Sequence, residues 1–165
     1  MDLDRLKTQF GVSIKVNERS KAITLESHKS RLVEVLTHLK TEGYAVLTDL
    51  TAIDHLEPEV YTVVYYLLQN PKTLERIRVI VVIKRKEPLP SVCSIWEGAD
   101  WYERELFDMF GIWFDNHPDL KRILMPDDWV GHPMQRDYPL TEKPVQFKHD
   151  VKPKIPSEII PYVRK

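Results

Sequence analysis

Hydrophobic and polar residues alternate along several short segments of this chain of 165 residues, and such alternation predicts β-strands. Residues 12–17 and 22–27 alternate on either side of a polar turn at 18–21. Three longer segments are rich in β-branched and aromatic residues and predict further strands at 44–54, 60–69 and 75–85. The turns between them are expected at residues 55–58 and at Asn70–Pro71.

Other segments repeat with the period of a helix. In residues 29–42 the leucines and valines recur every three or four positions, so we predict a helix that Gly43 ends. Residues 2–10 predict a short helix of the same kind, and residues 99–110 predict another, with Gly111 as its C-terminal cap.

The helix predicted over residues 99–110 has one apolar face, which we expect to point into the core. Glu103 and Glu105 then lie on opposite sides of that face. Arg104 and Asp108 are four residues apart on the outer face and are expected to pair. Two aromatic residues, Trp101 and Phe107, also point outward, and exposed aromatic residues are typical of protein interfaces.

The order of these elements predicts an α+β fold, a two-layer α/β sandwich with a mixed or antiparallel sheet. We assign residues 1–87 to this sandwich domain and residues 88–140 to a short helix and an irregular segment packed on the same domain. Ten of the twelve prolines lie at or beyond Pro88. Residues 141–165 are rich in proline and are predicted to form an extended C-terminal arm. Such an arm is either a disordered tail or a strap over a partner, and the apolar residues 159–163 favour the strap.

Composition excludes several classes of function. The formal net charge of −1 gives no overall basic field for nucleic acid. The longest apolar run, residues 79–83, is far too short to cross a membrane. The charged N-terminus lacks the apolar core of a secretion signal, so we expect a cytoplasmic protein.

The residues that usually carry catalysis are sparse. Cys93 is the single cysteine, so the chain cannot form its own disulfide or a cysteine-based cluster, and we expect a small buried residue rather than a nucleophile. His117 and His132 each precede a proline and have no second ligand at metal-binding spacing. The five glycines are scattered singly, which excludes a phosphate-binding loop. We therefore expect no catalytic residue and no metal or cofactor site.

Two segments carry a resemblance to a known family. The stretch "ERELFDMFGIWFDNHPDLKRIL", from Glu103 to Leu124, and the following "DDWVGHPMQRDYPL" resemble the signature of the 30 kDa (C-type) subunit of respiratory complex I, the proton-pumping NADH:quinone oxidoreductase. Asn116 stands where that family usually has glycine, and asparagine tolerates left-handed backbone angles. Gln135 stands where the family has a basic residue, which leaves Arg136 to carry the charge.

The resemblance implies a non-catalytic subunit of the peripheral arm that docks onto the 49 kDa (D-type) subunit and near the iron–sulfur and quinone-site subunits. It implies no cofactor in this chain, with FMN and iron–sulfur clusters in partner subunits. It also implies a place on the cytoplasmic face of the inner (plasma) membrane, held there by the complex. The signature and interface residues it marks are Glu103, Arg104, Glu105, Phe107, Asp108, His117, Pro118, Asp119, Lys121, Arg122, Arg136, Asp137 and Tyr138.

Two alternatives stay open. One is the equivalent subunit of a membrane-bound hydrogenase or related complex, because such assemblies share this module. The other is a free-standing enzyme that uses the carboxylates near Glu103. For the first interpretation we predict that the arm contributes most of the binding, so truncation after Leu140 should weaken it.

Overall fold

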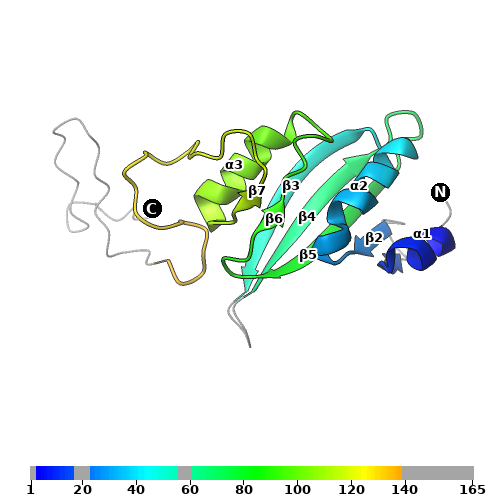
Figure 1. Ribbon diagram of the computed structural model, residues 1–165, viewed down its shortest axis with the longest axis horizontal. Helices are drawn as coiled ribbons and strands as arrows, with labels where there is room; N and C mark the ends of the chain where they lie inside the picture. The colour runs from blue at the N-terminus through cyan, green and yellow to red at the C-terminus, as the bar shows by residue number, and fades with distance from the viewer. Residues whose placement is uncertain (1–2, 17–22, 56–60, 139–165) are drawn as a thin grey trace, which may run out of the picture.

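A mixed five-stranded sheet forms the centre of the protein (Figure 1). The computed structural model describes residues 3–16, 23–55 and 61–138, and the predicted arm at 141–165 and the turn at 18–21 lie outside this part. The strand order is β1-β2-β5-β4-β3. The strands are β1 (Ser13–Val16), β2 (Ile23–Glu26), β3 (Val46–His55), β4 (Tyr61–Gln69) and β5 (Arg76–Lys84).

The predicted α+β sandwich is confirmed, with a mixed sheet. β2 pairs parallel with β5, and the other neighbours are antiparallel. The helices are α1 (Leu3–Phe10), a short 3-10 turn (Lys29–Arg31), α2 (Leu32–Thr41) and α3 (Ala99–Phe110). His55 still belongs to β3, one residue beyond the predicted strand. No helix in the described ranges is long and apolar enough to cross a membrane.

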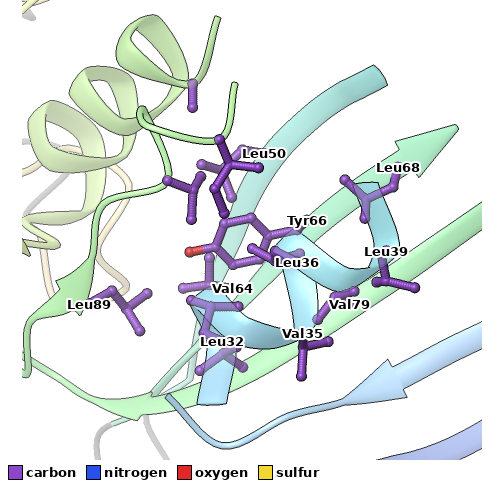
Figure 2. Packing of buried hydrophobic residues seen from close by; sticks show 14 of the residues in the cluster. Leu32, Val35, Leu36, Leu39, Leu50, Val64, Tyr66, Leu68, Val79 and Leu89 are labelled. Carbon is purple, nitrogen blue, oxygen red and sulfur yellow. The ribbon is translucent and has the colours of Figure 1, made fainter. Parts of the chain in front are cut away.

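Strand register divides the sheet into two faces. On the inner face Leu50, Tyr66 and Val79 lie side by side across β3, β4 and β5. Helix α2 packs its buried leucines against this row, which Figure 2 shows from close by. Each fully buried side chain of this kind stabilises the fold by about 1.5–3 kcal/mol. The alternation seen in the sequence therefore decides which side of the sheet becomes the core.

Helix α3 lies along the edge strand β3 at the other end of the sheet (Figure 1). Tyr102 donates its hydroxyl hydrogen to the carbonyl of Thr48 at 3.2 Å, and the indole of Trp96 donates to the carbonyl of Ala45 at 2.8 Å. An open strand edge is a template for unwanted pairing with another chain. Tyr102 occupies a carbonyl group of β3, and Trp96 occupies the carbonyl of the residue just before the strand.

A second, parallel pair of very short strands joins β6 (Leu89–Pro90) to β7 (Phe114–Asp115). It brings the segment before α3 next to the segment after it. Two residues are too short to show any periodicity, so the sequence did not predict this pair.

Candidate functional site

Helix α3 spans the predicted residues and ends at Gly111, whose φ of 74° is left-handed. The Gly111 N–H donates to the carbonyl of Phe107, as a C-terminal cap does. A Cβ atom at this position would also lie 2.6 Å from Cδ2 of His132. Gly111 is therefore required for its backbone angle and for the close approach of the segment that returns to the helix.

The returning segment also donates hydrogen bonds to the other free carbonyl groups at the end of α3. The last four carbonyls of a helix have no partner within it. The ring of His132 donates from Nδ1 to the carbonyl of Asp108 at 2.9 Å. The N–H of Met134 donates to the carbonyl of Met109 at 2.9 Å. The side chain of Gln135 donates to the carbonyl of Phe110 at 2.6 Å, so the residue that departs from the family pattern makes a structural contact.

Asp108 is the centre of the contacts that hold residues 122–125. Its carboxylate is fully buried and accepts from the guanidinium of Arg122 and from the backbone N–H groups of Ile123, Leu124 and Met125 at 2.8–3.1 Å. Burial on its own favours the neutral acid, but the bonds from Met125 and Arg122 outweigh it and lower the pKa of Asp108. The carboxylate thus stays charged and fixes the turn around it.

Two arginines hold the irregular segment through its carbonyl groups. Arg122 donates to the carbonyls of Trp129 and Gly131 at 2.9 and 3.1 Å. Arg104 donates to the carbonyls of Lys121 and Arg122 at 3.2 and 3.1 Å. A guanidinium suits this task because its several N–H groups lie in one rigid plane.

The predicted surface pair of Arg104 with Asp108 is wrong. Asp108 points away from solvent into the turn at 122–125, and its ionic partner is Arg122. Arg104 instead lies over the ring of Trp101, 5.1 Å from its centre. The helical period correctly predicted that Asp108 lies on the side of α3 away from the sheet. That side is not exposed to solvent, because the segment that follows the helix covers it.

Glu103 forms a second buried cluster below α3. Its Oε1 accepts from the N–H of Val92 at 2.7 Å, and its Oε2 lies 3.5 Å from the thiol of Cys93. Burial raises the pKa of Glu103 although the bond from Val92 opposes the shift. Burial also raises the pKa of the Cys93 thiol to about 11, and Ser91 and Glu103 modify that shift, so the thiol is not a ready nucleophile.

His117 completes this cluster with a fully buried ring. Its Nδ1 accepts from the N–H of Asp119 at 3.1 Å, so the ring carries its hydrogen on Nε2. Nε2 lies 3.1 Å from Oδ1 of Asp100 and 3.9 Å from Oε2 of Glu103. The hydrogen-bond acceptor of Nε2 is the carbonyl of Asp100 at 3.3 Å, so the ring joins the loop to the first turn of α3.

Cys93, Glu103 and His117 have the chemistry of a metal site, with ligand atoms within 4.8 Å of one another. A metal-binding histidine needs a free nitrogen and usually donates the hydrogen of its other nitrogen. Here the other nitrogen already accepts a hydrogen bond, so Nε2 must keep its proton. The arrangement favours a hydrogen-bonded cluster over a metal centre.

A third set of polar contacts joins the end of the described chain to the sheet. Arg85 pairs with the buried Asp54 and, at 2.6 Å, with Asp137. Asp54 also accepts from the N–H of Arg136 at 3.0 Å and from the hydroxyl of Thr62 at 3.1 Å. The carboxylate of Asp54 therefore anchors residues 136–137 to β3, β4 and the end of β5.

The remaining signature residues lie at the surface. Glu105, Pro118, Asp119, Lys121 and Arg136 are exposed, and Tyr138 is half-buried. Phe107 is half-buried, with its ring edge-on to the exposed Trp113 at 5.9 Å and to His132 at 6.1 Å. The signature thus divides into side chains that fold the segment and side chains that face outward.

Residues 25–144 match the family described as the 30 kDa subunit of respiratory-chain NADH dehydrogenase. The chain belongs to this family. The match includes all the signature residues, so the predicted resemblance to the 30 kDa subunit family is confirmed.

Individual members and solved structures agree with this assignment. The C subunit of the NADH-quinone oxidoreductase of Citrifermentans bemidjiense is 43% identical over 140 residues, which cover 82% of this chain and 86% of the relative. A solved trypsin-resistant fragment (1–134) of Nqo5 matches with a TM-score of 0.63 and 30% identity, covering 73% of this chain and 100% of the fragment. A chain of the membrane-bound sulfane sulfur reductase, an archaeal respiratory membrane complex, has a TM-score of 0.74 over 83% of this chain and 82% of its own length. Its identity of 22% shows a shared fold.

The reasoning from the sequence missed the contacts of Asp54, Arg85 and His132. A signal for Asp54 was present, because the alternation that turns Leu50 and Ala52 inward also turns Asp54 inward. A carboxylate in that position needs a partner. Nothing in the local sequence identified Arg85 or the distant Asp137 as that partner.

Proposed function

We propose that this family member is a non-catalytic subunit of the peripheral arm of a proton-translocating NADH:quinone oxidoreductase. In this proposal it docks onto the D-type subunit and helps to hold the neighbouring quinone-site and iron–sulfur subunits. One observation carries the proposal: the buried polar residues of the signature bind the chain's own loop. Asp108 and Arg122 bind backbone groups of the segment that follows α3. Glu103 accepts from the N–H of Val92, and His117 accepts from the N–H of Asp119.

The side chains that face outward support a docking role. Trp101, in the first turn of α3, is 60% exposed, and Trp113, two residues after the cap Gly111, is 52% exposed. Aromatic residues and arginine are enriched in the centres of protein interfaces. Large exposed aromatic side chains beside charged ones therefore suit burial against another protein of the complex.

The chemistry of the chain also supports a role without its own cofactor. The single thiol has a raised pKa, and the His117 ring lacks a free nitrogen for a metal. In this proposal FMN and the iron–sulfur clusters belong to partner subunits. The chain is held at the cytoplasmic face of the membrane through the complex.

The test is recovery of the native protein from its own membranes, with the co-purifying subunits identified by mass. We expect a D-type subunit and an NADH-oxidising module with flavin and iron–sulfur clusters. The double variant Trp101→Ala/Trp113→Ala should retain about tenfold less of the D-type subunit, as loss of interface centres does. Val16→Ala, an exposed apolar position on β1, is the matched control and should retain it fully. NADH oxidation by the purified chain alone would overturn the proposal.

A second candidate is the equivalent subunit of a membrane-bound hydrogenase or related complex. The fold that the chain shares with a chain of the sulfane sulfur reductase complex supports it. The same recovery experiment separates the two candidates, since nickel–iron hydrogenase subunits would then co-purify in place of the NADH-oxidising module.

A further inference from the structure

The side of the sheet opposite α2, which we name the outer face, is unusually apolar for a surface. Register places Ile53, Val63 and Val82 in one row across β3, β4 and β5. Tyr65 and Ile80 lie together in the next row. Together these residues form a contiguous apolar band across the three long strands.

The band does not belong to the hydrophobic core. The core cluster contains α2 and the inner-face residues, and none of the five residues of the band belongs to it or packs against it. Ile53 is 44% exposed and Val82 is 47% exposed, whereas Val63, between them in the same row, is 8% exposed. A contiguous apolar patch on a protein surface marks an interaction site, whereas single exposed apolar residues are ordinary.

Positive charge borders this band along β5. Arg76 and Arg78 are exposed on the outer face, and neither forms an ion pair with any other residue of the described ranges. Arg78 lies over the ring of Tyr65, 5.9 Å from its centre. Leu67 and Asp49 continue the face beside them, and all four line a hollow of about 390 Å³. Asp49 supplies the one carboxylate among the residues that line the hollow, and Glu26 on the neighbouring strand β2 pairs with Lys15, so the two arginines are in excess.

We propose that the outer face binds an acidic amphipathic segment of a neighbouring subunit in the NADH-quinone oxidoreductase, and this inference rests on the proposed function. The apolar side of the segment covers the band from Ile53 to Val82. Its carboxylates reach Arg76 and Arg78, and a side chain enters the hollow above Leu67. Charge complementarity of this kind selects a partner and sets its orientation.

Two other occupants fit the charges less well. The chain's own residues 141–165 contain six basic and three acidic residues, so they carry the same sign as the arginines. A second copy of the chain across a two-fold interface would present the same surface, in which two arginines and one carboxylate line the hollow, so it would bring no surplus of acidic groups. Like charges brought together in an interface oppose binding.

The first test compares maleimide labelling of a Val82→Cys variant in the isolated chain and in the purified, intact enzyme complex. We expect labelling in the complex to be at least tenfold slower. Val33→Cys is the control, since Val33 is an exposed valine of α2 on the opposite side of the sheet. The unmodified chain gives the background from Cys93. Equal labelling of the Val82→Cys variant in both states would overturn the inference.

The second test identifies the occupant. The Arg78→Lys variant introduces an amine that a carbodiimide joins directly to a touching carboxylate. We expect the cross-link to join this amine, within the intact complex, to an aspartate or glutamate of another subunit. A cross-link to residues 139–165, or to a second copy of this chain, would overturn the inference.

The two proposals fail in different ways. If the NADH-quinone oxidoreductase is purified without this chain, the proposed function fails. If the chain is present in the complex but its Val82→Cys variant labels freely, the proposed function stands and only the inference about the outer face fails.

Discussion

Among single residues, Asp108 makes a set of buried contacts that the sequence did not reveal. A carboxylate on the outer side of a surface helix normally contributes little. Asp108 is instead fully buried and accepts hydrogen bonds from one guanidinium and three consecutive backbone N–H groups. Removing the charge leaves the largely buried Arg122 without its ionic partner, and an unpaired buried charge lowers the free energy of unfolding.

We predict that Asp108→Asn lowers the free energy of unfolding by about 3–5 kcal/mol, as the loss of one member of a buried ion pair does. Asp128→Asn, at an exposed aspartate of the same segment, should change it by no more than about 0.5 kcal/mol. Urea unfolding at neutral pH measures both values. Equal midpoints for the two variants would contradict this account.

The lowered pKa of Asp108 gives a second prediction for the same residue. Its folded-state pKa lies below that of the unfolded chain, so its contribution to stability is complete above the unfolded pKa and is lost as the pH falls through the folded one. The stability of the Asp108→Asn variant should therefore fall less on acidification than that of the natural chain. Urea midpoints measured between about pH 6 and pH 3 test this, because the ordinary pKa of aspartate is about 3.9.

At the scale of elements, the end of α3 depends on the segment that follows it. Gly111 allows the chain to leave the helix and lets His132 approach it. His132, Met134 and Gln135 then close three carbonyl groups of the last turn. The helix and the irregular segment therefore form one unit.

We predict that Gly111→Ala destabilises the protein by about 1–2 kcal/mol for the left-handed angle, with a further cost from contact with His132. The control is Gly98→Ala at the other end of α3, where φ is −64° and nothing lies within 4 Å of an added Cβ. In a His132→Ala background the cost of Gly111→Ala should be smaller, since the contact is gone while the angle remains. Thermal unfolding of the four variants measures the difference, and a cost unchanged by His132→Ala would exclude the contact.

Most helices and strands could be predicted from the sequence because each packs against a single layer, so the spacing of its apolar residues follows one buried face. The five strands and α2 pack against one core, so the alternation of their residues reports their inner faces. Helix α3 is covered on two sides, by the sheet and by residues 122–135. The helical period predicts where Glu103 and Asp108 lie around the helix axis. It does not predict the second layer that covers the helix, because that layer comes from residues outside the helix.

At the scale of the whole molecule, a set of polar contacts around Asp54 joins the irregular segment to the sheet. Asp54 lies in β3, Arg85 directly follows β5, and Asp137 comes from the end of the described chain. The inner pair is buried, whereas Asp137 is about half exposed. These contacts therefore have an inner part that supports the fold and an outer part that holds the segment in place.

We predict that Asp137→Ala frees the end of the segment without unfolding the sheet. Chymotryptic cleavage after Trp129 should become severalfold faster, while the free energy of unfolding changes by less than about 1 kcal/mol, as for other exposed pairs. Asp127→Ala, at an exposed aspartate that lies before Trp129, should leave the cleavage rate unchanged. A cleavage rate equal to that of the natural chain in both variants would show that the outer pair does not hold the segment.

The closure of α3 by residues 132–135 also limits how the length of this region can change. Surface loops usually accept added or deleted residues. Here Arg122 holds the carbonyls of Trp129 and Gly131, and the next residue, His132, meets the helix end. One added residue between Trp129 and His132 would move each donor away from its carbonyl. Insertions and deletions should therefore be tolerated near the exposed residues 126–128 and excluded from residues 129–135.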